Sequence, residues 1–178
     1  MGKPSMSYDD YRKEMSKKGT EYENYIYPIF AKEWGVPEDW VKPYAEKDQQ
    51  IKIGENWLGV EIKYDEKSIK SPNLYIEVEE KGHEKRIDYT RSGIFRPDNT
   101  FLFLIGNYDI YYVFEIDTIR KLFKNYKTIE NGRCTSKGFL LPKPQARESA
   151  INVSVLKEEN EFEQLAFHWA IQPFPKQI

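Results

Sequence analysis

Two apolar runs separated by only three residues constrain the fold of this chain more than any other feature. The runs are FLFLIG (101–106) and IYYVFEI (110–116), and NYD lies between them. So short a connection predicts an antiparallel β-hairpin. Apolar residues fill consecutive positions in both runs, which is the pattern of strands covered on both faces. We therefore expect this hairpin at the centre of a sheet that is packed on both sides.

A helix should precede these strands. The segment TEYENYIYPIFAKEW (20–34) carries apolar residues at helical spacing, and Thr20 followed by Glu23 has the spacing of a capping box at the helix start. Pro28 should kink or shorten the helix, and Gly35 should end it. The expected inward stripe consists of Tyr22, Ile26, Ile29, Phe30 and Trp34.

The remaining patterns predict a mixed α/β or α+β sheet flanked by helices. QQIKI and WLGVEIKY, joined by GEN, predict one more hairpin, and NLYIEVEE (73–80) alternates apolar and polar residues as a half-buried strand does. In chain order, the other expected elements are a short helix over 118–125 capped by Asp117, a Gly- and Pro-punctuated loop over 125–150, a strand over 151–156 and an amphipathic helix over 159–170.

Composition argues against several classes of protein. The chain has 178 residues, which favours a single domain over 1–178. Its 27 Lys and Arg against 29 Asp and Glu argue against a polybasic nucleic-acid coat protein, although they permit a local basic cleft. The lone Cys134 cannot form an internal disulfide, and no Cys/His cluster has zinc-binding spacing. No run is long enough to span a membrane, so we expect a cytoplasmic protein with no membrane partner.

The strand WLGVEIKY carries the residues of most chemical interest. The apolar row that should face the core is Leu58, Val60 and Ile62. Glu61 and Lys63 then lie together on the opposite face, because side chains alternate along a strand. If residues 54 and 55 form the turn of this hairpin, Asp48 lies directly across from Glu61. A two-residue slip would place Asp48 across from Lys63, and a one-residue slip would put the two acids on opposite faces.

Asp48 and Glu61 in the first of these registers would hold a divalent cation. Two carboxylates so close repel each other, and a hard cation such as Mg²⁺ relieves the repulsion while keeping waters and phosphate oxygens as its other ligands. Lys63 could then hold or deprotonate the attacking water, or stabilise developing negative charge. Glu23, on the inward stripe of the first helix, is a candidate third acid. This arrangement suits hydrolysis of a phosphodiester.

These residues resemble the active-site set of the PD-(D/E)xK nuclease superfamily. The likeness covers roughly residues 19–116 and rests on GVEIKYDEK, SPNLYIEVEE and RSGIF, which are similar to the runs E-x-K-x-D, N-x-x-x-E and S-G-I of phage and bacterial members. The resemblance implies a restriction-endonuclease-like mixed sheet flanked by helices, with a nuclease core over about 19–124 and an extension over about 125–178. It also implies that DNA is the partner and that Mg²⁺, for which Mn²⁺ can substitute, is the cofactor of hydrolysis.

The same resemblance assigns roles to individual residues. Asp48 and Glu61 would be metal ligands, Lys63 the residue that activates water, and Glu23 an accessory acid. Glu77 matches a recurrent acid and would join a second metal position. Cutting both strands of a duplex would favour a homodimer, because each chain carries one such site. Restriction, homing, junction resolution and phage DNA processing all stay open, because specificity lies in loop contacts.

Other interpretations of the same residues also stay open. Arg91 and Arg96, on either side of SGI, are candidate DNA phosphate contacts or solvated loop charges. Glu61 and Lys63 could belong to an exposed sheet face with cross-strand ion pairs. The chain could be a catalytically inactive nuclease-fold module that binds DNA or a protein, or an enzyme of another kind in which Glu-x-Lys is coincidental.

Overall fold

The computed structural model of the protein describes residues 6–37, 41–44, 48–53 and 56–156, with side chains in 6–37 and 59–156. This part of the chain is a mixed α+β structure with three α-helices and two β-sheets. In chain order its elements are α1 (Tyr8–Glu33), β1 (Val41–Tyr44), β2 (Asp48–Ile53), β3 (Asn56–Tyr64), the 3₁₀ turn η2 (Glu66–Ile69), β4 (Asn73–Glu80), β5 (Thr90–Arg91), the 3₁₀ turn η3 (Gly93–Phe95), β6 (Thr100–Gly106), β7 (Ile110–Glu115), α2 (Ile116–Phe123), β8 (Ile129–Glu130), β9 (Ser136–Pro142), α3 (Lys143–Ser149) and β10 (Asn152–Val155).

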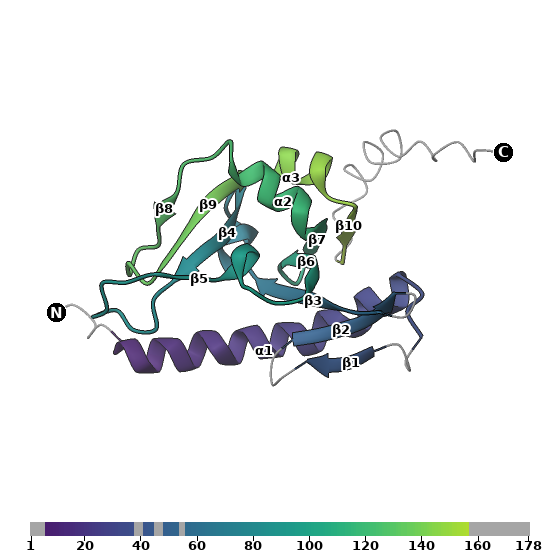
Figure 1. Ribbon diagram of the computed structural model, residues 1–178, viewed down its shortest axis with the longest axis horizontal. Helices are drawn as coiled ribbons and strands as arrows, with labels where there is room; N and C mark the ends of the chain where they lie inside the picture. Colours follow the sequence, from purple (N-terminus) through teal and green to yellow (C-terminus); the bar gives the residue numbers. More distant parts are fainter. Residues whose placement is uncertain (1–5, 38–40, 45–47, 54–55, 157–178) are drawn as a thin grey trace.

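The strands form two separate sheets. The larger has the order β1-β2-β3-β6-β7-β10, in which β3 and β6 run parallel and all other neighbours are antiparallel. The smaller has the order β5-β4-β9-β8 and is antiparallel throughout. In Figure 1, α1 runs along the lower side of the molecule, and α2 and α3 lie on the upper side. The sequence predicts a mixed sheet flanked by helices, but it does not predict the second sheet.

The hairpin of β6 and β7 is confirmed, and it lies inside the larger sheet. Its strands are buried on both faces, because alternate residues enter two different hydrophobic clusters. The α1 core consists of Tyr22, Ile26, Phe30, Val60, Ile62, Leu102, Leu104, Tyr111 and Val113. The β4 core consists of Leu74, Ile76, Val78, Ile94, Phe103, Ile105, Tyr112, Phe114, Ile116, Ile119, Phe139, Leu141 and Ala146. The larger sheet therefore lies between α1 on one side and the second sheet with α2 and α3 on the other.

The first helix is longer than the sequence predicts. It begins at Tyr8, and the Ser7 hydroxyl accepts a hydrogen bond from the backbone N–H of Asp10, so the expected N-cap at Thr20 is wrong. Pro28 lies inside the helix, which continues to Glu33. Gly35, with φ of +60°, follows the helix end as predicted. No helix in the described ranges is both long and apolar enough to cross a bilayer.

Two further expectations need correction after β7. The short helix α2 begins at Ile116, so Asp117 lies in its first turn and Glu115 occupies the cap position. The expected loop over 125–150 contains β9 and α3, because β9 pairs along almost the whole length of β4. The predicted strand near 151–156 is confirmed as β10, which pairs with β7. The helix predicted over 159–170 lies outside the described residues.

Candidate functional site

The register of the β2–β3 hairpin is the one that brings positions 48 and 61 together. Ile53 pairs with Asn56 at the turn, and Gln49 pairs with Val60 at the other end. Continuing this register by one residue puts position 48 of β2 across from Glu61 of β3. The side chain of Asp48 lies outside the described side chains, so its approach to Glu61 stays a prediction.

Glu61 is a buried carboxylate held by two cations. Its side chain is 3% exposed, and its Oε1 atom lies 2.5 Å from Nζ of Lys63 on the same strand. The other oxygen, Oε2, lies 3.1 Å from an Nη atom of Arg96, which follows η3. The side chains of Lys63 and Arg96 are 32% and 34% exposed. The carboxylate is thus enclosed, whereas the side chains of the two cations are each about one-third exposed.

Glu77 of β4 joins the same group from the second sheet. The Ser92 hydroxyl donates a short hydrogen bond to its carboxylate. Burial raises the pKa of Glu77 above its ordinary value, although Lys63 and the Ser92 hydrogen bond both act in the opposite direction. Burial alone would lower the pKa of Lys63, but the charges of Glu61 and Glu77 outweigh it and hold this pKa above its ordinary value. We call Glu61, Lys63, Glu77, Ser92 and Arg96 the Glu61 cluster.

Gly93 is the residue that lets the SGI segment approach β4 so closely. Its φ of +51° is left-handed, and a Cβ atom there would lie 2.2 Å from the backbone oxygen of Glu77. The preceding residue, Ser92, donates its backbone N–H to the Val78 oxygen. Arg96 in turn donates its backbone N–H to the Gly93 oxygen and so closes η3. Glycine at position 93 therefore allows both Ser92 and Arg96 to reach the carboxylates.

Asp65 fixes the connection between the two strands that carry the acids. Its carboxylate accepts hydrogen bonds from the backbone N–H groups of Ser68 and Tyr75. The Ser68 hydroxyl accepts a 2.8 Å hydrogen bond from the side chain of Asn107, in the β6–β7 turn. The aspartate of the E-x-K-x-D run is therefore a structural cap, which joins the end of β3 to the start of β4. Sequence reasoning assigned Asp65 no role.

The other candidate residues lie elsewhere. Glu23 is half-buried on α1, which packs on the Val60 and Ile62 face of β3, whereas Glu61 belongs to the opposite row of this strand. Arg91 is exposed in β5 and forms no ion pair within the described part of the chain. The structure thus brings Glu61, Lys63, Glu77 and Arg96 together and leaves Arg91 outside. Ser92 is a member that sequence reasoning missed, although RSGIF contains it.

The acids of the Glu61 cluster are oxygen ligands of the hard type. Among the described side chains, which do not include Asp48, no three His, Cys, Asp or Glu residues converge as a metal site would require. The cluster itself holds two carboxylates and two cations, so its formal charges balance. An anion approaching from solvent would meet Lys63 and Arg96 before the buried carboxylate. This layering suits recognition of a phosphate group.

Comparisons of the chain with protein-family models, with curated proteins and with solved structures yield no match.

Proposed function

We propose that the protein is a Mg²⁺-dependent endodeoxyribonuclease of restriction-endonuclease-like fold. The observation that carries the proposal is the Glu61–Lys63 pair on a central strand, with Glu77 arriving from β4. The register, which puts position 48 of β2 across from Glu61, supports a second acid at the same place. Paired carboxylates beside an ammonium group are what metal-assisted hydrolysis of a phosphodiester needs.

The donor set fits a magnesium ion that shares Glu61 with its cations or replaces one of them. Asp48 and Glu61 would hold the ion and Glu77 would join a second position, while waters and phosphate oxygens complete the shell. Both described oxygens of Glu61 already face a cation, but each oxygen has a second lone pair, so the ion can bind beside Lys63 and Arg96 or displace one of them. When bound, Mg²⁺ would act as a Lewis acid on the phosphate and lower the pKa of a coordinated water.

The cations of the cluster then have distinct tasks. Because its pKa is raised, Lys63 is an ammonium ion at neutral pH and is a hydrogen-bond donor rather than a proton acceptor. Of the roles predicted for Lys63, this favours orienting the attacking water and stabilising charge on the phosphate over removing a proton from the water. Arg96, once displaced from Glu61, offers a planar pair of N–H donors to a phosphate oxygen. Glu23 lies on the α1 side of the larger sheet, away from Glu61, so the proposal gives it no contact with the ion.

One observation favours a second candidate, an inactive nuclease-fold module that binds DNA or a protein. Lys63 and Arg96 already neutralise Glu61, so the cluster is electrostatically satisfied without any metal. In such a module the two cations would be structural partners of a buried carboxylate. The two candidates differ in whether Mg²⁺ competes successfully for Glu61.

Cleavage assays separate these candidates. The protein is incubated with supercoiled, linear and branched DNA in Mg²⁺, Mn²⁺ or EDTA, alongside Glu61→Gln, Lys63→Ala and a charge control, Lys121→Ala on α2. We expect metal-dependent cutting by the wild type and by Lys121→Ala, and loss of at least ~100-fold in the other two variants. Cutting that survives both cluster substitutions, or that persists in EDTA, contradicts the proposed mechanism. DNA binding without cutting supports the module, and linear rather than nicked product supports a homodimer.

A further inference from the structure

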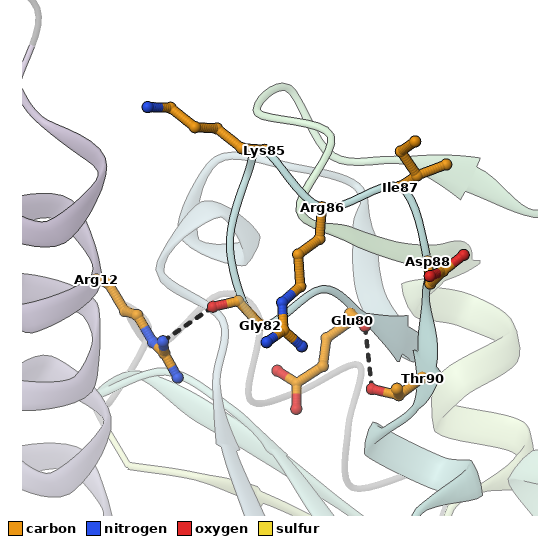
Figure 2. Close-up of a pocket in the computed structure, with 8 residues that line it drawn as sticks. All are labelled: Arg12, Glu80, Gly82, Lys85, Arg86, Ile87, Asp88 and Thr90. Carbon is orange, nitrogen blue, oxygen red and sulfur yellow. Dashed lines mark hydrogen bonds between the residues drawn. The ribbon is translucent and has the colours of Figure 1, made fainter.

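A charged cavity lies between the first turns of α1 and the loop that follows β4. Its volume is about 510 Å³, and part of its lining comes from Arg12 of α1 and from Glu80 at the end of β4. The loop contributes Gly82, Lys85, Arg86, Ile87 and Asp88, and β5 contributes Thr90. Figure 2 shows these residues arranged around the hollow. The cavity is separate from the Glu61 cluster, none of whose members lines it.

Contacts between α1 and the loop give this cavity a defined shape. The guanidinium group of Arg12 donates a 3.1 Å hydrogen bond to the Gly82 oxygen. The ring of Tyr8 packs against the ring of His83, with centroids 4.7 Å apart. The Thr90 hydroxyl donates to the Glu80 oxygen on the other side of the loop. The loop is therefore attached both to the helix and to the sheet.

Two guanidinium groups converge in the cavity, and neither forms an ion pair with another described residue. Figure 2 shows the side chains of Arg12 and Arg86 turned toward each other near Gly82, while Lys85 points away. Across the described residues, neither arginine takes part in an ion pair, and the carboxylate of Glu80 lies beyond ion-pair distance from both. Each guanidinium group has five N–H donors, and the contact with Gly82 uses one of those of Arg12. Two such groups match an oxyanion, phosphate above all.

A second hollow continues from the first along α1. Its volume is about 330 Å³, and its lining is Asp9, Arg12, Lys13 and Ser16. Arg12 lines both hollows, so they adjoin at this residue. Lys13 and the Ser16 hydroxyl add further donors for phosphate oxygens. The two hollows form a path that is longer than a single free phosphate ion would need.

This path lies close to the Glu61 cluster along the chain fold. Glu80 lines the cavity and Glu77 belongs to the cluster, and three residues of extended strand span ~10 Å. The adjacent segment runs antiparallel to β4, from Thr90 at the cavity to Ser92 at the cluster. A distance of ~10 Å is covered by a few successive phosphates of one nucleic-acid strand. The exposed Arg91 stands between the two places.

We propose that the hollows on either side of Arg12 bind successive phosphates of a nucleic-acid strand whose scissile phosphate lies at the Glu61 cluster. The proposal rests on the proposed function for that last phosphate, but its own contacts are those of Arg12, Arg86 and Lys13. Glu80 faces the same space and opposes an anion. Removing the charge of Glu80 should therefore strengthen the binding that the arginines provide.

The test measures DNA binding in EDTA, so that it does not depend on cutting. A short fluorescently labelled duplex is titrated with wild-type protein, Arg12→Ala, Arg86→Ala, Glu80→Gln and the charge control Lys121→Ala, over a series of salt concentrations. Each arginine variant should bind about tenfold more weakly and lower the salt dependence by about one phosphate contact. Glu80→Gln should bind more tightly, and Lys121→Ala should stay within about twofold of the wild type.

Two results would overturn this inference. Arginine variants that behave like Lys121→Ala, or a wild type that binds no DNA, would remove the phosphate path. In a second arm, the protein is titrated with inorganic phosphate and followed by NMR. Shifts at Arg12 and Arg86 without any effect of these residues on DNA affinity would assign a free-phosphate site instead. Arginine-dependent binding by a protein that never cuts would leave the path standing and refute the nuclease alone.

Discussion

Removing both cations that hold Glu61 should destabilise the protein by more than the sum of the two single removals. Lys63→Met or Arg96→Met leaves the buried carboxylate one described ion pair, and we expect each to cost ~1 kcal/mol, because both cations are partly exposed. The double variant takes both of the described ion pairs from a carboxylate that is only 3% exposed. Its expected cost is ~3–5 kcal/mol, which is the range for breaking a buried pair.

Removing the carboxylate in place of the two cations should destabilise the protein less than the double variant does. Glu61→Gln leaves Lys63 and Arg96 without their carboxylate, but these groups can be hydrated, so the expected cost is ~1 kcal/mol.

In the double variant the pKa of Glu61 should rise above its value in the unfolded chain, since burial then acts with less compensation. A raised carboxyl pKa means that stability is higher below the unfolded value and is lost as the pH rises through the folded value. The double variant should therefore recover part of its stability near pH 5 relative to pH 7.

Urea unfolding measures these free energies. Wild type, the two single variants, the double variant, Glu61→Gln and the surface control Lys121→Met are compared near pH 7 and near pH 5. The non-additive part should amount to at least ~1 kcal/mol, since both cations contact one carboxylate. The reasoning is refuted if the costs add to within about 0.5 kcal/mol, or if the penalty of the double variant is the same at both pH values.

Two other substitutions test how the Glu61 cluster is assembled. Gly93→Ala should cost at least ~2–3 kcal/mol, because a Cβ atom would lie 2.2 Å from the Glu77 oxygen at a left-handed φ, whereas the open site Gly132→Ala should be nearly neutral in a thermal melt. Equal effects at the two glycines would contradict the close approach. Burial raises the pKa of Glu77 from 4.5, so its contribution to stability is present at lower pH and is lost as the pH rises through the folded value. Glu77→Gln should therefore flatten the fall of unfolding free energy as the pH rises above 4.5, and an unchanged slope in urea unfolding would count against this.

Local patterns predicted the elements whose signals are contained within a few residues. The β6–β7 hairpin follows from two apolar runs and a short turn, and the β2–β3 hairpin follows from two runs around GEN, although the sequence leaves its register open. The start of α1 does not follow from a local apolar pattern, because residues 8–19 are highly charged and offer no clear apolar stripe. Ser7, followed by the acidic pair Asp9 and Asp10, was the signal that marked this start.

Contacts between distant residues could not be predicted in this way. The strand β9 contains Gly138 and ends at Pro142, so its local sequence predicts a loop, and its pairing with β4 makes it a strand. At the candidate site, Glu61 and Lys63 were predicted to share a face because they lie on one strand. Arg96 lies 35 residues from Glu61, and no local rule connects them. Its ion pair with Glu61 depends on the left-handed turn at Gly93 and on how closely β4 approaches.

The strand β6 sends alternate side chains into two separate apolar clusters, and this has a consequence for how the protein opens. If β6 leaves its place, Leu102 and Leu104 are lost from one cluster at the same moment as Phe103 and Ile105 are lost from the other. Neither cluster can therefore lose β6 while the other stays intact. Backbone amides on β6 should accordingly exchange with deuterium only when the whole described unit unfolds, whereas those of the exposed loop over 82–88 exchange early.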